Sequence, residues 1–191
     1  MADIDIEEIV SRVLEKMAGA KPSADVDLKP DTTTRQVPLN LRDDVKRVAI
    51  GSDKSSADVR KIVTQYLESA GYRVVDVCAE AGDTTTFADT AVAVAKKVAS
   101  GECERGIMFD PDGIASAMAC NKVKGVRAAL CYDMRSVVNS REHVNANVMT
   151  LGGPIHNEAE LCEMSRVWLE LRFPGGKYWA HVNSIMSIER T

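Results

Sequence analysis

The chain has 191 residues, of which 45% are hydrophobic and 27% are charged, and its formal net charge at pH 7 is −4. This composition is typical of a globular protein with a sizeable core, and the lack of excess positive charge argues against nucleic acid as a partner. No apolar run approaches the ~20 residues of a membrane span, so a membrane is not an expected partner either. Five cysteines without a C-x-x-C pair favour buried thiols in the reducing cytoplasm over disulfides or a zinc site.

Residues 1–18 predict a short amphipathic helix. Their apolar residues recur mostly at three- and four-residue steps, as in Ile6, Ile9, Val10 and Val13, so that they line one face. The segment is acidic at its start, which argues against a secretory signal. A helix of this length is marginal on its own in water, so it needs a surface to lie on.

Residues 19–45 have the composition of a linker. Pro22, Pro30 and Pro38 are interleaved with serine, threonine and aspartate, which predicts an extended, flexible segment. An amphipathic helix on such a tether is suited to docking on a partner. The alternative is that the helix folds back onto its own domain.

Residues 46–191 predict one α/β domain, because strand-like and helix-like segments alternate along them. This order predicts a doubly wound, Rossmann-like sheet of five parallel strands with helices on both faces. A ligand site is expected beyond the carboxyl ends of the strands. The expected strands are Val45–Ile50, Arg73–Val77, Arg105–Phe109, Val126–Cys131 and Asn147–Leu151. The expected helices are Ala57–Ala70, Phe87–Ala99, Gly113–Lys122, Ser136–Glu142, Glu158–Leu171 and Val182–Arg190.

Four stretches of this domain resemble the ribose-5-phosphate isomerase B and galactose-6-phosphate isomerase family. They are VAIGSD at 48–53, the block from Gly101 to Asp133 that contains ACNKVKGVRAA, SREHVNANVMTLGG at 140–153 and FPGGKYWAHVNSI at 173–185. The resemblance implies the fold just described and aldose–ketose isomerisation of a sugar phosphate without a cofactor or a metal. It also implies a homodimer or tetramer with its sites between subunits and with the C-terminal segment crossing to the neighbouring subunit.

The segment before the domain resembles the encapsulation peptides of enzymes packaged in bacterial microcompartments. Those peptides are short amphipathic helices joined to an enzyme by a flexible linker, which matches residues 1–18 and 19–45. The resemblance implies that residues 1–18 contact shell proteins or co-packaged enzymes. It places the chain in the bacterial cytoplasm, within a microcompartment lumen.

The resemblance assigns the chemistry to His143, Asp110 and Asp112. His143 matches the histidine that opens the sugar ring and is expected on the ligand side of the sheet, although a lone histidine at a helix end is also compatible with a plain surface position. Asp110 stands where many relatives have a catalytic cysteine; a carboxylate there can act as the base, or it can cap the following helix. Asp112 replaces a neutral hydroxyl residue in the same loop.

Further positions match residues that hold the substrate. Asp53 is expected to contact the substrate's hydroxyl groups or to cap the next helix, and Lys54 replaces a family histidine with a point charge that could meet phosphate. Lys177 and His181 stand where the family has two arginines for the phosphate. A lysine still binds phosphate, although it lacks the two-pronged geometry of arginine.

Three more residues complete the predicted substrate-binding set. Arg141 could supplement the weakened phosphate site. Asn121 and Asn147 keep family positions, although either could instead satisfy the backbone of a loop.

The loop from Asp110 to Ala115 departs from the glycine-rich turn of the family. Pro111 has no N–H to offer a developing oxyanion, and Asp112 adds negative charge. Two functions therefore remain open. One is a divergent sugar-phosphate isomerase packaged in a microcompartment, and the other is a non-catalytic or altered-substrate relative that serves as a packaged binding or scaffold protein.

Overall fold

The computed structural model describes residues 44–81 and 86–190, all within the unit formed by residues 35–191. The predicted helix of residues 1–18 and the predicted linker of residues 19–45, apart from its last two residues, lie outside the described residues. None of the described helices is long and apolar enough to cross a bilayer.

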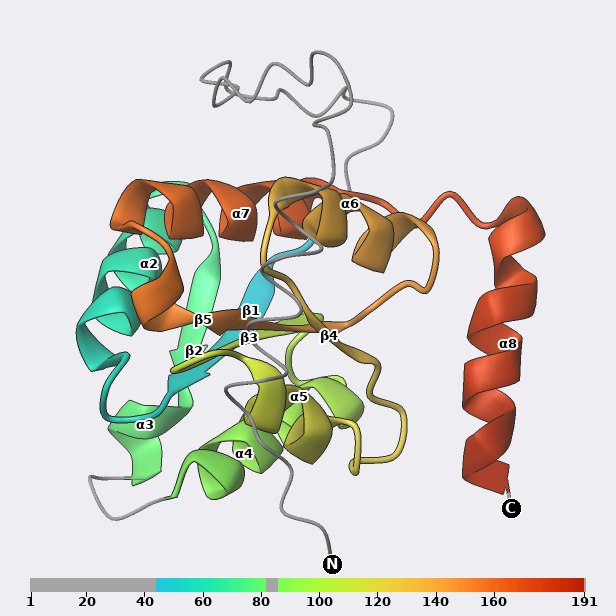
Figure 1. Cartoon of the computed structure of the whole chain (residues 1–191), viewed down its shortest axis with the longest axis horizontal. Coiled ribbons are helices and arrows are strands. Elements are labelled where there is room, and N and C mark those ends of the chain that lie inside the picture. The colour runs from blue at the N-terminus through green and yellow to red at the C-terminus, as the bar shows by residue number, and fades with distance from the viewer. Residues whose placement is uncertain (1–43, 82–85, 191) are drawn as a thin grey trace, which may run out of the picture. The chain divides into compact units, whose positions relative to one another are not determined.

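A five-stranded parallel sheet forms the centre of the domain, as the alternating pattern predicts (Figure 1). Its strand order is β2-β1-β3-β5-β4, and every strand is parallel to its neighbours. The three central strands are almost entirely buried, because helices cover both faces. The predicted α/β class and all five predicted strands are confirmed. The strands are β1 (Arg47–Ser52), β2 (Arg73–Asp76), β3 (Arg105–Asp110), β4 (Ala128–Leu130) and β5 (Val148–Gly152).

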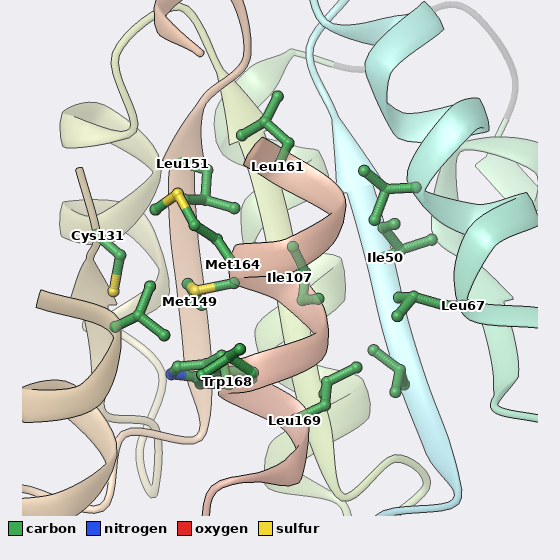
Figure 2. Packing of buried hydrophobic residues seen from close by; sticks show 14 of the residues in the cluster. Ile50, Leu67, Ile107, Cys131, Met149, Leu151, Leu161, Met164, Trp168 and Leu169 are labelled. Atoms are coloured by element: carbon green, nitrogen blue, oxygen red, sulfur yellow. The ribbon is translucent and has the colours of Figure 1, made fainter. Parts of the chain in front are cut away.

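Two helical layers enclose the sheet (Figure 1). One face carries α2 (Ala57–Ser69), α6 (Met134–Glu142) and α7 (Glu158–Glu170), and the other carries α3 (Val77–Ala81), α4 (Phe87–Ala99) and α5 (Ile114–Cys120). In the first layer, α7 places Leu161, Met164, Trp168 and Leu169 over Ile107 and Leu151 of the sheet (Figure 2). Burial of such large apolar side chains contributes about 1.5–3 kcal/mol each.

Local hydrogen bonds explain where several elements begin. Reciprocal capping boxes start α4, α6 and α7 at Thr86, Asp133 and Asn157. The box at Asp133 starts α6 two residues before the predicted helix. The predicted strand through Val77 ends instead at Asp76, because the Asp76 carboxylate accepts the backbone N–H of Cys78 at 3.0 Å and opens the short helix α3.

The C-terminal segment stands apart from the two layers (Figure 1). After η2 (Gly153–Ile155) and α7, the chain forms η3 (Gly176–Tyr178), α8 (Trp179–Ser187) and η4 (Ile188–Arg190). The last helix therefore begins three residues earlier than predicted. Side-chain contacts tie this segment to the loop before β4: the Glu189 carboxylate accepts the N–H of Gly125 at 2.8 Å, and Arg127 Nη1 donates to Met186 Sδ at 3.2 Å.

Candidate functional site

Asp110 ends β3 at the carboxyl edge of the sheet and is only 1% exposed. Its Oδ1 accepts the backbone N–H groups of Asp112, at 3.0 Å, and of Gly113, and its Oδ2 accepts the N–H of Ser116 at 3.0 Å. The carboxylate thus holds the turn that leads into α5. Asp110 therefore caps this helix, which is one of the two roles expected for it. Its burial leaves little of it available to a substrate.

Asp112 lies in the same turn but is exposed. Its Oδ1 accepts the N–H of Ile114 at 2.9 Å. The next residue, Gly113, has a φ of +78°, and a Cβ there would lie 2.5 Å from Leu130 Cδ1. The turn is therefore tightly packed underneath, and Asp112 is the carboxylate that it presents outward.

Asp53 and Lys54 follow β1 at the same edge. The Asp53 N–H donates to the carbonyl of Phe109 at 3.0 Å, and its carboxylate accepts the Ser55 hydroxyl at 2.8 Å and the Ser56 N–H at 3.0 Å. Asp53 thus organises the turn before α2 and stays half-buried, while Lys54 is exposed. Asp53, Lys54, Asp110 and Asp112 form what is here termed the carboxyl-edge group.

His143 lies at the opposite edge of the sheet, and its expected place on the ligand side is wrong. It follows α6, which returns across the sheet from the end of β4, and it precedes the first residue of β5 by five positions. Asp110 pairs with Gly152, the last residue of β5. The five-residue strand β5 is about 13 Å long at ~3.3 Å per residue, so His143 and Asp110 lie at opposite ends of it.

Lys177 and His181 gather with His143 around the ring of Tyr178. The His143 and Tyr178 rings stack with centroids 4.6 Å apart and planes 24° apart. The His181 ring lies 5.8 Å from that of Tyr178, and Lys177 Nζ lies 5.1 Å from its centroid. A groove of about 510 Å³, lined in part by Arg135, Asn139 and His143, adjoins the cluster. His143, Lys177, Tyr178 and His181 form what is here termed the amino-edge group.

Tyr178 is not among the site residues that the sequence predicts. Because Tyr178 follows Lys177 directly and precedes His181 by three residues, the sequence alone indicates that it lies near both. Its contact with His143 joins segments 35 residues apart in sequence, which spacing alone does not reveal.

Arg141 is a correction to the predicted substrate-binding set. It is only 3% exposed, and Nε donates to the Leu171 carbonyl at 3.2 Å while Nη1 donates to Asn145 Oδ1 at 2.9 Å and to the Ala146 carbonyl. Its guanidinium also lies 5.7 Å from the Trp168 ring. Arg141 is therefore an internal residue that joins α6, the end of α7 and the loop before β5.

Asn121 and Asn147 also satisfy the backbone, the alternative raised for them. Asn121 accepts the N–H of Ala128 at 2.8 Å and donates to the Ala128 carbonyl at 2.9 Å. Asn147 accepts the N–H of Arg127 at 2.7 Å and donates to the Gly125 carbonyl at 2.9 Å. Together they fasten the α5–β4 loop. Across the part of the chain that is described, no three His, Cys, Asp or Glu side chains form a group able to hold a metal ion.

The sequence model of the Ribose/Galactose Isomerase family matches residues 48–185. The chain belongs to the ribose/galactose isomerase family. It is 33% identical over 138 residues to the galactose-6-phosphate isomerase subunit LacA 2 of Streptococcus pyogenes, covering 72% of this chain and 96% of that one. It is also 33% identical to the D-erythrulose-4-phosphate isomerase of Pectobacterium atrosepticum, covering 68% of this chain and 86% of the relative.

The family also accounts for the fold. The structure of ribose-5-phosphate isomerase B of Clostridium thermocellum is similar with a TM-score of 0.71 and 33% identity, covering 75% of this chain and 97% of that one. The match over residues 48–185 includes both the carboxyl-edge and the amino-edge group. These relatives of the ribose/galactose isomerase family are sugar-phosphate isomerases, which is consistent with the predicted isomerase.

Proposed function

We propose that the chain is an aldose–ketose isomerase of a sugar phosphate whose complete site combines two chains. The observation that carries this proposal is the separation of the carboxyl-edge and amino-edge groups across β5 within one chain. Each group holds part of the required chemistry. A second copy related by a two-fold axis can bring its amino-edge group to the carboxyl-edge group of the first.

Asp112 is the proposed base. Isomerisation requires a group that moves a proton between neighbouring carbons, and this group must reach the substrate. Asp112 is exposed, whereas Asp110 is 1% exposed and uses both of its oxygens for backbone N–H groups. In this proposal Asp110 holds the turn that presents Asp112.

The other roles follow from chemistry and position. His143, half-buried in the amino-edge group, opens the sugar ring. Lys177 and His181 beside it, together with Lys54 of the partner chain, neutralise the phosphate. Asp53 orients the hydroxyl groups of the substrate. Sugar phosphates with four, five and six carbons are the substrates to assay, because relatives named for each length match this chain.

Exposed apolar surface supports the pairing of two chains. The C-terminal segment leaves Trp179, Ile185 and Ile188 between 40% and 70% exposed. A groove of about 430 Å³ lies beside β4. It is lined by Ile114 and Met118 of α5, by the residues that follow this helix and by one residue of β4. Apolar patches of this kind on a small domain mark surfaces that bind another protein. A homodimer in which the C-terminal segments cross between chains would cover them.

Subunit complementation tests the composite site. Asp112→Asn and His143→Ala are each expected to be inactive alone. When both variants are unfolded and refolded together, half of the dimers contain one chain of each kind, and each mixed dimer has one intact site. The mixture should regain about a quarter of wild-type activity. No recovery, with mixed dimers verified by mass spectrometry, would contradict a site built from two chains.

A non-catalytic relative would give a different pattern. Neither a four-, five- nor six-carbon sugar phosphate would then be converted, and none would raise the melting temperature of the wild-type chain. Stabilisation together with turnover supports the isomerase, because only a ligand that binds the folded state raises its stability.

Packaging in a microcompartment is a separate part of the proposal and rests on the amphipathic pattern of residues 1–18 and the composition of residues 19–45. Deletion of residues 1–18 should leave activity intact and abolish co-localisation with shell proteins. Shell localisation of the deleted chain would contradict the proposed role of this segment.

A further inference from the structure

We infer that Tyr178 is a positioning residue that orients the His143 imidazole and couples it to the phosphate-binding side chains. The inference rests on the proposed function, in which His143 opens the sugar ring. Tyr178 itself contacts no reacting atom in this assignment and acts through its aromatic face.

The His143 and Tyr178 rings form a stack. His143 follows α6 with its backbone held by a hydrogen bond from its N–H to the Asn139 carbonyl at 2.9 Å. Its side chain still has two rotatable bonds. The Tyr178 ring, with its centroid 4.6 Å away and its plane inclined by 24°, favours one plane for the imidazole. Aromatic pairs at such distances contribute beyond the apolar area that they bury.

The Tyr178 ring also contacts Lys177 and His181, the two side chains proposed to bind phosphate. Lys177 Nζ lies 5.1 Å from the Tyr178 centroid, within the ~6 Å range of a cation–π contact. The His181 ring lies 5.8 Å away at an inclination of 60°. One ring thus joins the proposed catalytic imidazole to the two side chains proposed to bind phosphate.

In this arrangement, binding of the phosphate group affects the orientation of the His143 imidazole. An anion held by Lys177 and His181 limits the motion of both residues and therefore of the Tyr178 ring between them. The orientation of His143 then depends on whether the phosphate is bound. Binding energy from a part of the substrate that does not react is in this way used to align a catalytic group.

The His143 stack and the Lys177 contact involve the face of the Tyr178 ring, and none of the three contacts is a hydrogen bond of the phenol hydroxyl. Tyr178→Phe should therefore preserve the stack, whereas Tyr178→Leu removes the aromatic face while keeping an apolar side chain. The pair separates positioning by the ring from simple occupation of space.

Nuclear magnetic resonance provides a readout that does not depend on activity. The chain has three histidines, so His143, His156 and His181 give three imidazole Cε1–H signals. In Tyr178→Leu, the His143 signal should shift as the ring current of Tyr178 is lost, while His156, which lies beside Glu160, stays in place and reports an intact fold. Inorganic phosphate should shift His143 and His181 in the wild type, but only His181 in Tyr178→Leu.

Kinetics complete the test. Tyr178→Leu should lower kcat by about 10- to 100-fold with little change in KM, and Tyr178→Phe should retain the wild-type kcat. An unmoved His143 signal or a wild-type kcat in Tyr178→Leu, with His143→Ala inactive, would overturn the positioning role alone. Full activity of His143→Ala would overturn the proposed function and the role of Tyr178 with it.

Discussion

The carboxyl-edge and amino-edge groups are held in place by different interactions. At the carboxyl edge, Asp53 and Asp110 accept backbone N–H groups within a few residues of themselves, so each carboxylate shapes its own turn. At the amino edge, His143 and His181 are placed by ring contacts with Tyr178. The carboxylates of the first group are fixed by local hydrogen bonds, whereas the second group depends on one ring stack, between His143 and Tyr178, that joins separate segments.

The two carboxylates of the carboxyl-edge turn, Asp110 and Asp112, accordingly have different environments. The carboxylate of Asp110 acts as a structural acceptor for three N–H groups, while the neighbouring Asp112 stays outside. The amino-edge group combines His143 at the end of α6 with Lys177 and His181 of the C-terminal segment. Substitutions should accordingly affect stability at buried positions and activity at exposed ones.

The largest expected effect concerns Arg141, the internal residue at the amino edge. Arg141→Met removes the donor to Asn145 Oδ1 and to the buried carbonyl of Ala146, while the Leu171 carbonyl keeps a donor in Arg105 Nη2 at 2.9 Å. Two acceptors lose their charged donor, at about 1–3 kcal/mol each, so the free energy of unfolding should fall by about 3–4 kcal/mol. Denaturant unfolding monitored by circular dichroism measures this loss. Arg135→Met, an exposed change on the same helix, should cost less than about 0.5 kcal/mol, and equal losses for both would contradict the internal role of Arg141.

Alkaline pH should weaken the packing behind the carboxyl edge. Burial raises the pKa of the Cys120 thiol to about 12 and that of Cys131 to about 11, from 9.0 for an ordinary thiol. The unfolded chain therefore loses these protons first, and the stability that is fully present below pH 9 declines as the pH rises toward 11. Each thiol costs about 1.4 kcal/mol per pH unit only above pH 9, so the pair should cost about 3 kcal/mol between pH 8 and pH 10.

The control for this titration is the same measurement on variants. Cys120→Ala with Cys131→Ala should flatten the decline, whereas Cys78→Ala, at a half-buried site, should leave most of it. A decline of equal slope in the double variant would show that other groups cause the alkaline loss.

Gly113 tests how tightly the carboxyl-edge turn is packed. Alanine at this position would combine a φ of +78° with a Cβ 2.5 Å from Leu130 Cδ1 and 3.1 Å from the backbone of Leu151. Strain and overlap together should cost about 3 kcal/mol. Gly101 has a similar φ of +76° with nothing near its Cβ, so Gly101→Ala should cost only about 1 kcal/mol in the same unfolding experiment. Matching losses would mean that backbone conformation, and not packing, sets the need for glycine.

The sequence predicts the framework well, because periodicity and turn residues report local structure. The five strands and the enclosing helices other than α3 follow from these signals, with shifts at the ends where side-chain caps such as Asp133 decide the first residue. The capping alternative for Asp110 follows from the same local rule, since the accepted N–H groups lie within six residues of it.

The site itself is harder to predict, because its residues come from segments that only the tertiary fold brings together. The edge of the sheet on which His143 lies depends on the direction of α6, which a motif match leaves unspecified. The internal position of Arg141 depends on α7, whose end lies 30 residues away. The charge of Arg141 suggests that it binds phosphate, yet two of its acceptors are backbone carbonyl groups, which any sequence provides.

The smallest expected effect on stability separates Asp110 from Asp112. Asp110→Asn keeps one acceptor oxygen but replaces the other with an NH₂ group. This donor would face the buried N–H of Ser116 or Gly113, which should lower the free energy of unfolding by about 2 kcal/mol. Asp112→Asn, at an exposed site, should cost less than about 0.5 kcal/mol and yet abolish turnover. Melting curves and kcat for both variants test this division. If Asp110→Asn were as stable as wild type and inactive, while Asp112→Asn stayed active, the base would be Asp110, and the turn would have to open for the substrate to reach it.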